Sequence, residues 1–338
     1  MKAIRVKVPN EISIDEDPIP KIDEGNEVLI KVKTAGICGS DISIFKGTSP
    51  VATYPRVIGH EFAGEVTAIG KDVKNIAVGD HVTVNPVHNC EVCPICRKGR
   101  GNVCASLKVT GVHLDGGYRE YVKVPEKNVF KVSKDIPWDI AAVIEPYTVA
   151  AQVVGRGGVE KGDTVLIYGS GQIALTILQV CNIIGAKCIM TDIVDNRLVK
   201  AKEFGADHVI NSQKEDAVKK VLELTDGIGA DVSIDAACVG ISLKESALAT
   251  RPAGVVVTMG FHDNTAQITE FIITSRELDV RGTRLNNNKF SQVIEWIESK
   301  QLEPSKIIAH HFKFTDIEKA FEQLKNDPEN TMKIVLEF

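Results

Sequence analysis

The sequence predicts an α/β protein in two parts, one with an antiparallel, barrel-like sheet and one with a parallel sheet. The chain has 338 residues, which is too long for one ordinary hydrophobic core, so two domains of about 150 residues are expected. Short β-branched runs separated by glycine and proline fill residues 1–150, and strands alternate with helices from about residue 150 onward. These three observations define the fold class.

The first part carries the signals of strands joined by turns. Its β-branched runs are followed by turn residues such as Gly79–Asp80 and Gly116–Gly117. Runs of this length between glycine and proline are typical of an antiparallel sheet. We expect strands at 28–32, 63–69, 81–84 and 121–124.

The pattern changes in the second part. An apolar strand at 164–168 leads through a glycine-rich turn into an amphipathic helix at 172–184. A strand at 188–191, a helix at 197–204 and a strand at 207–210 follow. Alternation at this spacing predicts βαβ units and a parallel sheet.

Periodicity alone leaves the C-terminal segment unassigned. Residues 288–298 and 315–325 have the apolar spacing of amphipathic helices, and residues 333–336 have that of a closing strand. These elements could extend the parallel sheet or return to the first part.

Composition excludes several classes of protein. With 43% hydrophobic and 25% charged residues, the chain is neither disordered nor collagenous. Its net charge of −5 and its 5% aromatic content lack the basic excess and stacking residues of a nucleic-acid binder. No apolar run reaches the roughly 18–20 residues of a membrane span, and MKAIRVKVPN has no signal-peptide core. We therefore expect a cytoplasmic protein that binds neither nucleic acid nor a membrane.

A glycine-rich turn follows the strand at 164–168. Gly169-Ser170-Gly171-Gln172-Ile173-Ala174 matches G-x-G-x-x-A, which lets a pyrophosphate approach the backbone and the N-terminus of a helix. Asp192 ends the next strand, 23 residues after Gly169. A carboxylate there binds ribose hydroxyls and repels a 2′-phosphate, which favours NAD over NADP. Arg197 could contact the adenine or be a solvated helix residue, and a turn that binds no nucleotide is the alternative interpretation.

Four cysteines lie within fifteen residues and predict a structural zinc site in a loop at about 88–106. Four thiolates in one loop suit tetrahedral Zn²⁺. A bacterial ferredoxin run has its last cysteine after three residues and before proline, whereas here it follows seven residues and precedes Ala105. A zinc ribbon that binds nucleic acid would need basic residues around it, and the three basic residues of this loop have the pattern of a solvated surface. The predicted ligands are Cys90, Cys93, Cys96 and Cys104.

A second set of metal ligands is mixed in type. Cys38 precedes Gly39-Ser40-Asp41, and His60 and Glu61 follow Gly59. A thiolate, an imidazole and a carboxylate leave a coordination position for water or substrate. Glu145 interrupts the apolar segment AAVIEP, and a carboxylate buried there needs a partner such as a metal.

Together these residues resemble the zinc-dependent medium-chain dehydrogenase/reductase family. Gly59-His60-Glu61-x2-Gly64-x5-Gly70-x2-Val73 matches its zinc signature, and the four-cysteine loop, the GSGQIA turn and Asp192 follow in family order. Glu145 before proline is similar to the polyol branch, because an alcohol dehydrogenase would have a cysteine there. The segments YPRVIGHE, GVHLDGGYREY, IDAAC and RLNNNKF are most similar to bacterial L-galactonate/L-gulonate 5-dehydrogenases, some of them called starvation-sensing proteins.

The resemblance implies a domain arrangement. A GroES-like β-barrel catalytic domain would cover residues 1–148, and a Rossmann domain with a doubly wound parallel sheet would cover 149–285. Residues 286–338 would then return to the catalytic domain. The resemblance also implies a homodimer or a homotetramer.

The resemblance implies roles for particular residues. Cys38, His60 and Glu61 would bind a catalytic zinc ion, with Glu145 as a further ligand, directly or through water. Ser40 would receive the substrate proton, and Thr148 would contact the nicotinamide. Family members usually have a histidine five residues after the zinc cysteine, where this chain has Ser43. The terminal proton acceptor would then be water or His113.

The implied activity is NAD-dependent oxidation of a secondary hydroxyl of a sugar acid, L-gulonate or L-galactonate at C5. A polyol or polyol-phosphate dehydrogenase is the runner-up, and a non-catalytic sensor could use the same fold. A zinc-free quinone or enoyl reductase is disfavoured, because it would not keep Cys38, His60 and Glu61. A substrate carboxylate needs cationic or donor groups, for which the candidates are Arg56, His113, Arg284 and Asn286.

Overall fold

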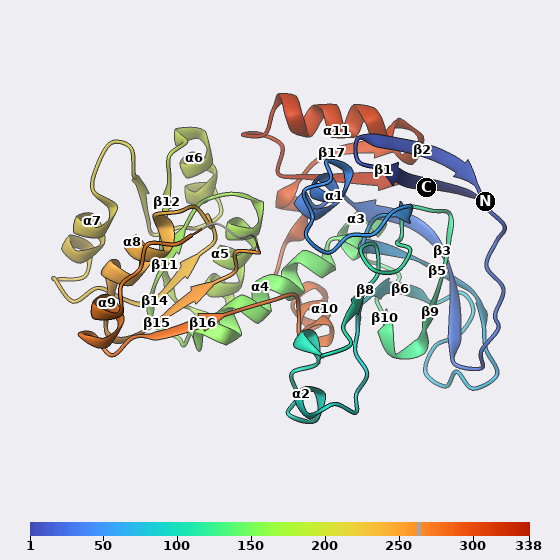
Figure 1. Cartoon of the computed structure of the whole chain (residues 1–338), viewed down its shortest axis with the longest axis horizontal. Helices are drawn as coiled ribbons and strands as arrows, with labels where there is room; N and C mark the ends of the chain where they lie inside the picture. Colours follow the sequence, from blue (N-terminus) through green and yellow to red (C-terminus); the bar gives the residue numbers. More distant parts are fainter. Residues whose placement is uncertain (262–264) are drawn as a thin grey trace. The chain divides into compact units, whose positions relative to one another are not determined.

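The computed structural model describes residues 1–261 and 265–338. The chain divides into two compact units (Figure 1). Unit 1 comprises Met1–Thr148 and Asn286–Phe338, and unit 2 comprises Val149–Leu285. Among the described residues, no helix has the length and apolar character needed to cross a membrane.

Unit 1 is built mainly on antiparallel strands. Its larger sheet has the order β10-β6-β5-β3-β18-β17, with β9 also paired to β3, and a smaller sheet has the order β2-β1-β4. The central strand β3 is rich in buried β-branched residues, among them Val28, Ile30 and Val32. The N-terminal strands are β1 (Lys2–Val8), β2 (Glu11–Glu16), β3 (Glu27–Gly36), β4 (Arg56–Val57), β5 (Glu61–Ile69), β6 (His81–Val84), β9 (Tyr121–Pro125) and β10 (Val129–Lys131).

Two short helices of unit 1 border these strands. Helix α1 (Gly39–Phe45) follows β3 directly, and helix α3 (Trp138–Ala142) follows β10 along the chain. The position of α1 matters for the site, because the helix begins one residue after Cys38.

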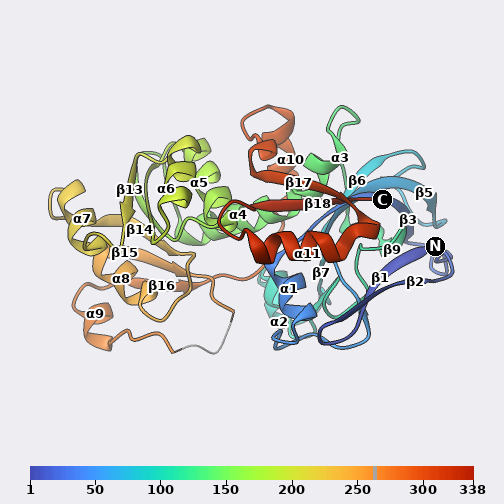
Figure 2. The same cartoon turned by 90° about the horizontal axis from the view of Figure 1, so that it is seen from above.

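The C-terminal segment belongs to unit 1. Strand β18 (Lys333–Glu337) pairs antiparallel with β3 and parallel with β17 (Ile308–Lys313). Helices α10 (Phe290–Glu298) and α11 (Ile317–Asn326) each begin two residues later than the sequence predicts. Figure 2 shows α11 in front of β17 and β18, and both chain termini in this unit.

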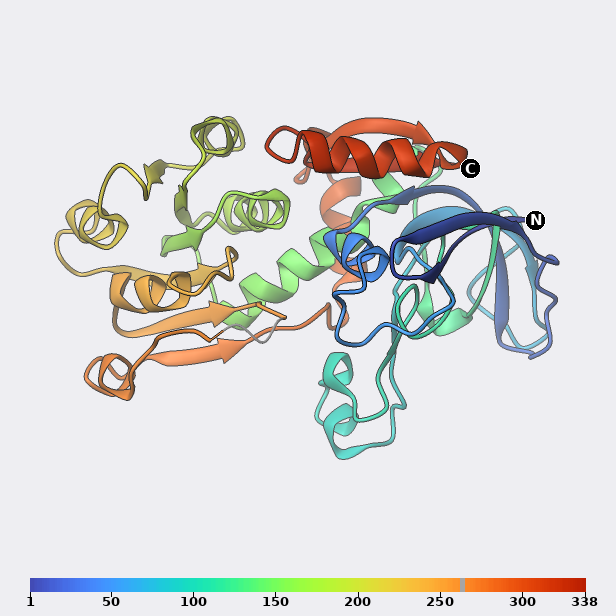
Figure 3. The same cartoon turned by 45° about the horizontal axis from the view of Figure 1, so that its top comes forward.

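The four-cysteine segment leaves the sheet as a loop. Strands β7 (Val87–His88) and β8 (Lys108–Val109) pair antiparallel and close its base. The loop contains the short helix α2 (Pro94–Arg97), which has Pro94 in its first turn, where proline is tolerated. Figures 1 and 3 both show this loop projecting from the strands of unit 1.

Unit 2 contains a six-stranded parallel sheet of order β13-β12-β11-β14-β15-β16. In chain order this is 3-2-1-4-5-6, the order of dinucleotide-binding Rossmann sheets. The predicted parallel sheet is therefore confirmed. Its strands are β11 (Thr164–Tyr168), β12 (Lys187–Asp192), β13 (His208–Asn211), β14 (Ala230–Asp235), β15 (Thr250–Thr258) and β16 (Asp279–Gly282).

Helices lie on both sides of this sheet (Figure 3). Helix α5 (Gln172–Ile184) has the predicted bounds and ends at Gly185, whose φ of +87° is the left-handed conformation that terminates helices. Helix α4 (Ile144–Gly157) precedes β11 in the chain. The other helices are α6 (Asp195–Glu203), α7 (Ala217–Leu224), α8 (Ser242–Ala249) and α9 (Glu270–Thr274).

Candidate active site

The four loop cysteines converge in unit 1. Their sulfur atoms form one group, with separations of 3.4 Å (Cys104–Cys90), 3.9 Å (Cys93–Cys104) and 4.0 Å (Cys90–Cys96). Four sulfurs at about 2.3 Å from a tetrahedral zinc ion lie roughly 3.8 Å apart. The loop therefore has the donor set and the spacing of a closed structural zinc site.

Backbone N–H groups in the loop are directed at these sulfurs. The amides of Cys90 and Ser106 donate to Cys104 Sγ at 3.4 and 3.3 Å. Amides of Ala105 and Cys96 lower the pKa of Cys93 to about 6. Because zinc binds the thiolate and not the thiol, these donors favour the ligating form.

A second group of ligand atoms is formed by Cys38, His60 and Glu61, all lying within 4.8 Å of one another. His60 and Glu61 are buried, whereas Cys38 is partly exposed. Cys38 immediately precedes α1, and Glu61 begins β5. Gly59 has φ +92°, and a Cβ there would lie 2.0 Å from the Tyr118 ring, so only glycine allows this turn into His60.

Asp41 holds the backbone on which this group of ligand atoms stands. Its carboxylate is fully buried and accepts hydrogen bonds from the Cys38 amide (2.9 Å), the Gly59 amide (3.2 Å) and the Tyr118 hydroxyl (3.1 Å). His60 Nδ1 lies 3.6 Å from Asp41 Oδ1, close enough for an ionic interaction but beyond hydrogen-bond distance. Burial opposes protonation of His60, but the Asp41 carboxylate raises its pKa well above the ordinary value.

Lys333 contacts Glu61 from the last strand of the chain. Its Nζ lies 2.8 and 2.6 Å from the two Glu61 oxygens and 3.0 Å from the Ile37 carbonyl. Both side chains are essentially unexposed. A carboxylate has about four lone-pair directions, so Glu61 can hold Lys333 and still offer an oxygen to a metal.

Glu145 lies outside the three-residue group. It is 3% exposed and stands in the first turn of α4. Burial raises the pKa of Glu145 to about 7, His60 and Lys333 act against this rise, and Glu61 adds to it. Glu145 therefore shares the electrostatic environment of the group without belonging to it.

Three candidate hydroxyl groups follow Cys38 and Glu145 in the chain. Ser40 lies in the first turn of α1. Ser43, one turn later, donates to the Gly39 carbonyl at 3.1 Å. The buried Thr148 donates to the Glu145 carbonyl at 2.6 Å.

In unit 2, the turn between β11 and α5 has the shape that its sequence predicts. Gly169 has φ +100°, and a Cβ there would lie 3.0 Å from the Ala237 amide nitrogen. Gly171 immediately precedes the first helical residue, Gln172, and Ile173 follows it. The first amides of α5 are thus at the carboxyl edge of β11, beside the switch in strand order where nucleotides bind.

Asp192 joins this turn to the end of β12. One oxygen accepts from the Ser170 amide at 2.8 Å, and the other accepts from the amides of Ile193 and Val194 at 2.8 and 3.0 Å. Arg197 Nη1 lies 3.9 Å from Asp192. The carboxylate is thereby fixed in position and 8% exposed.

Comparison with known proteins identifies this combination. Residues 24–134 match the alcohol dehydrogenase GroES-like domain, and residues 173–299 match the zinc-binding dehydrogenase family. The chain belongs to the zinc-dependent medium-chain dehydrogenase/reductase family. It is accordingly an oxidoreductase of the zinc-type alcohol dehydrogenases, as the sequence predicts.

Several relatives of this dehydrogenase are similar over nearly the whole chain. The starvation-sensing protein RspB of Escherichia coli K12 is 43% identical over 100% of this chain and 99% of its own. Sorbitol dehydrogenase of Bacillus subtilis is 31% identical over 97% and 95%. The crystal structure of the rspB alcohol dehydrogenase of E. coli CFT073 with NADH has a TM-score of 0.94 at 42% identity, covering 100% of this chain and 99% of that one.

The candidate substrate residues of the dehydrogenase each have contacts within their own unit. Arg56 donates to Asp115 at 3.0 Å and to Thr53 at 2.7 Å, and His113 Nδ1 accepts from the Val109 amide at 3.1 Å. Arg284 belongs to unit 2 and lies 4.7 Å from the Phe261 ring centroid. Asn286 is buried in unit 1, where it donates to Asn85 at 3.2 Å.

Two buried residues that contact the candidate metal ligands of this dehydrogenase were not identified from the sequence. Asp41 falls inside the segment that contains Cys38, and its spacing of three residues from that candidate metal ligand was the available signal. Lys333 carries no such signal, because it lies 272 residues after Glu61 and begins what looks like an ordinary closing strand. Only the pairing of β18 with β3 brings it to the site.

Proposed function

We propose that the protein is a zinc- and NAD-dependent dehydrogenase that oxidises a secondary hydroxyl of a sugar acid, L-gulonate or L-galactonate at C5. The observation that carries the proposal is the mixed group of Cys38, His60 and Glu61 within 4.8 Å, in a chain that also has a Rossmann sheet with an acidic residue at the end of its second strand. The family resemblance further suggests a homodimer or a homotetramer.

Two zinc ions per chain fit the donor sets. The four-cysteine loop would hold one ion as a closed structural site. Cys38, His60 and Glu61 would hold the other, with Glu145 as a further ligand, directly or through water. The carboxylate of Asp41 at His60 Nδ1 supports this assignment, because metal-bound histidines usually present their other nitrogen to such a group.

NAD would bind to unit 2. Gly169, Gly171, Gln172 and Ile173 would surround its pyrophosphate, and Asp192 would bind the adenosine ribose, with Arg197 beside it. The fixed orientation of the Asp192 carboxylate disfavours a 2′-phosphate and hence NADP. The solved RspB relative binds NADH, which supports the same choice.

When bound, zinc supplies a Lewis acid for the substrate hydroxyl and NAD supplies the hydride acceptor. By the family resemblance, the hydroxyl of Ser40, two residues after Cys38, would take the substrate proton. Ser43 follows one helical turn later but already donates to the Gly39 carbonyl. A serine cannot retain a proton at neutral pH, so we assign the final acceptor to water. Thr148 would contact the nicotinamide.

A carboxylate on the substrate requires a cation. The cationic candidates are Arg56, which is engaged by Asp115 and Thr53, and Arg284, which lies over the Phe261 ring. The segments shared with L-galactonate/L-gulonate 5-dehydrogenases and the similarity to RspB favour a hexonate. A neutral polyol or a polyol phosphate is the second candidate, because the chain is also similar to sorbitol dehydrogenase of Bacillus subtilis. It is similar as well to galactitol-1-phosphate dehydrogenase of Escherichia coli, at 28% identity and a TM-score of 0.93 over 100% of each chain.

The test is NADH formation by the zinc-loaded protein with a panel of hexonates, hexitols and hexitol phosphates. We expect L-gulonate or L-galactonate to have the highest kcat/KM, and Arg284→Ala to raise KM for hexonates but not for hexitols. Hexitols that exceed every hexonate by tenfold or more, a difference of about 1.4 kcal/mol in transition-state binding, would reverse the order of the two candidates. An absence of alcohol-dependent NADH formation would instead favour the non-catalytic sensor.

A further inference from the structure

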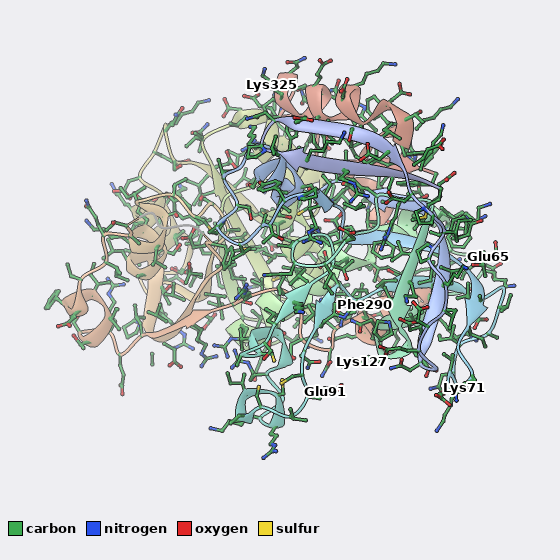
Figure 4. All side chains as sticks on the ribbon, turned by 45° about the vertical axis from the view of Figure 1, so that its right-hand side comes forward. Glu65, Lys71, Glu91, Lys127, Phe290 and Lys325 are labelled. Carbon is green, nitrogen blue, oxygen red and sulfur yellow. The ribbon has the colours of Figure 1, made fainter. Side chains whose placement is uncertain are left out.

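Unit 1 contains a polar pocket of about 260 Å³ beside the four-cysteine loop. Of the proposed zinc ligands only Cys96 borders it, so the pocket is distinct from the catalytic cluster. Its lining includes seven asparagines together with Glu91, Lys127 and Phe130. Figure 4 shows Glu91 and Lys127 near the loop and Phe290 close by.

The carboxamide of Asn128 has a defined orientation. Its Nδ2 donates to two backbone carbonyls, those of Asn85 at 2.7 Å and Val87 at 2.9 Å. A flipped amide would place its oxygen against both carbonyls, so the assignment of nitrogen and oxygen is fixed. Asn128 is 2% exposed, and its Oδ1 has no hydrogen-bond partner among residues 1–261 and 265–338.

Asn286 is oriented by a similar argument. Asn85 Oδ1 accepts from the Val87 amide at 3.1 Å, which identifies that atom as oxygen. Asn286 Nδ2 donates to the same oxygen at 3.2 Å, so Asn286 Oδ1 is directed elsewhere. Asn286 is 1% exposed, and within the described part of the chain its Oδ1 also lacks a partner. Asn128 and Asn286 both line this pocket, and within the described part of the chain each has a buried oxygen without a partner, although buried acceptors are normally satisfied.

The charges at the pocket rim compensate each other. Lys127 Nζ lies 3.2 Å from Glu91 and donates to the Asn89 carbonyl at 3.3 Å. Both side chains are largely exposed, and the other residues that line the pocket are neutral amides, glycine, apolar groups and one cysteine. A charged ligand would therefore be buried without a counter-ion, which is unfavourable. A hard cation such as Ca²⁺ prefers carboxylate ligands, and among the lining residues the one carboxylate, that of Glu91, is paired with Lys127.

Phe130 adds an apolar wall. Its ring stacks on Phe290 with centroids 4.9 Å apart, which fixes its position. We propose that this pocket binds a neutral polyhydroxylated molecule of the size of one sugar ring. Hydroxyl groups of the ligand donate to Asn128 Oδ1 and Asn286 Oδ1, and its C–H face contacts Phe130. This site goes beyond the proposed function, because it belongs to neither the catalytic cluster nor the cofactor turn.

The test uses the zinc-loaded full chain and titration calorimetry with methyl α-D-glucopyranoside, methyl α-D-galactopyranoside and myo-inositol. Asn286→Leu keeps the approximate volume but removes the acceptor, and should raise Kd about tenfold for the probe that binds best. Asn326→Leu, a change at an exposed asparagine of α11 in the same unit, should leave Kd unchanged. His60→Ala should also leave it unchanged, because the catalytic cluster is not involved.

A crystal structure with the best probe keeps the proposal testable if Asn286→Leu does not fold. The probe should lie with hydroxyls within hydrogen-bond distance of Asn128 and Asn286. The proposal is overturned if none of the three probes binds the wild type. It is also overturned if the crystal structure at saturating probe concentration shows only ordered water or a metal ion in the pocket. Binding lost in His60→Ala but kept in Asn286→Leu would assign the probe to the catalytic cluster and also overturn it.

Discussion

Replacing Lys333 with methionine should destabilise unit 1 far more than the loss of an ordinary ion pair. Lys333 is 0% exposed and Glu61 1%, and the nearest N–O distance is 2.6 Å. Methionine leaves the Glu61 carboxylate buried without this cation. Breaking a buried pair costs about 3–5 kcal/mol, and each kcal/mol shifts Tm by about 2–4 °C in a domain of 150–250 residues. We therefore expect the Tm of unit 1 to fall by about 6–20 °C.

Differential scanning calorimetry of the zinc-loaded full chain measures this shift. Lys319→Met is the matched control, because Lys319 is 71% exposed and pairs with Asp316 at 2.7 Å, a surface contact that contributes about 0–1 kcal/mol. If Lys333→Met lowers Tm no more than the control, the reasoning is refuted, and other groups neutralise Glu61.

Three further predictions concern metal, cofactor and proton transfer. Elemental analysis should find two zinc ions in the wild type and one in Cys96→Ser, which should also fold poorly. His60→Ala should stay folded by circular dichroism and lose turnover. One zinc ion or fewer in the wild type would contradict the assignment of two sites. Asp192→Ala should reduce the ratio of kcat/KM for NAD over NADP, and a wild type that prefers NADP would show that the assignment of Asp192 is wrong. Ser40→Ala should lower kcat by about 10²–10⁴-fold, while Ser43→Ala should cost little because that hydroxyl already donates to Gly39; equal losses would count against water as the acceptor.

The elements that the sequence predicts best are those with an uninterrupted apolar pattern. The bounds 164–168 and 172–184 agree with β11 and α5, because the strand is a continuous apolar run and glycines flank both ends of the helix. The helix α4 was not predicted, since Pro146 in its first turn and Gly155 near its end both weaken a helical pattern. Strand β17 was also missed, because its half-exposed IAHHFK sequence has no clear alternation.

In the candidate site, residues close together in the sequence could be predicted, whereas a residue far away in the sequence could not. Thiol, imidazole and carboxylate ligands can be predicted because their chemistry is specific and their spacing is short. Lys333 could not be predicted, because a lysine at the start of a strand normally faces solvent. Its burial depends on the register of β18 against β3, in which Val335 faces Gly36, and no local pattern fixes that register.

The charges of the catalytic cluster explain why these distant residues are present. Asp41, Glu61 and Glu145 are all buried carboxyl groups, the Cys38 thiol is a fourth acidic group, and Lys333 is the buried lysine that faces them. Buried acidic groups that outnumber the neighbouring cations, Lys333 and protonated His60, carry a large penalty. A divalent metal ion supplies the positive charge that the chain itself lacks. If Cys38 and His60 bind that metal as proposed, the partial neutralisation of Glu61 by Lys333 would leave more of the metal's charge for a substrate hydroxyl.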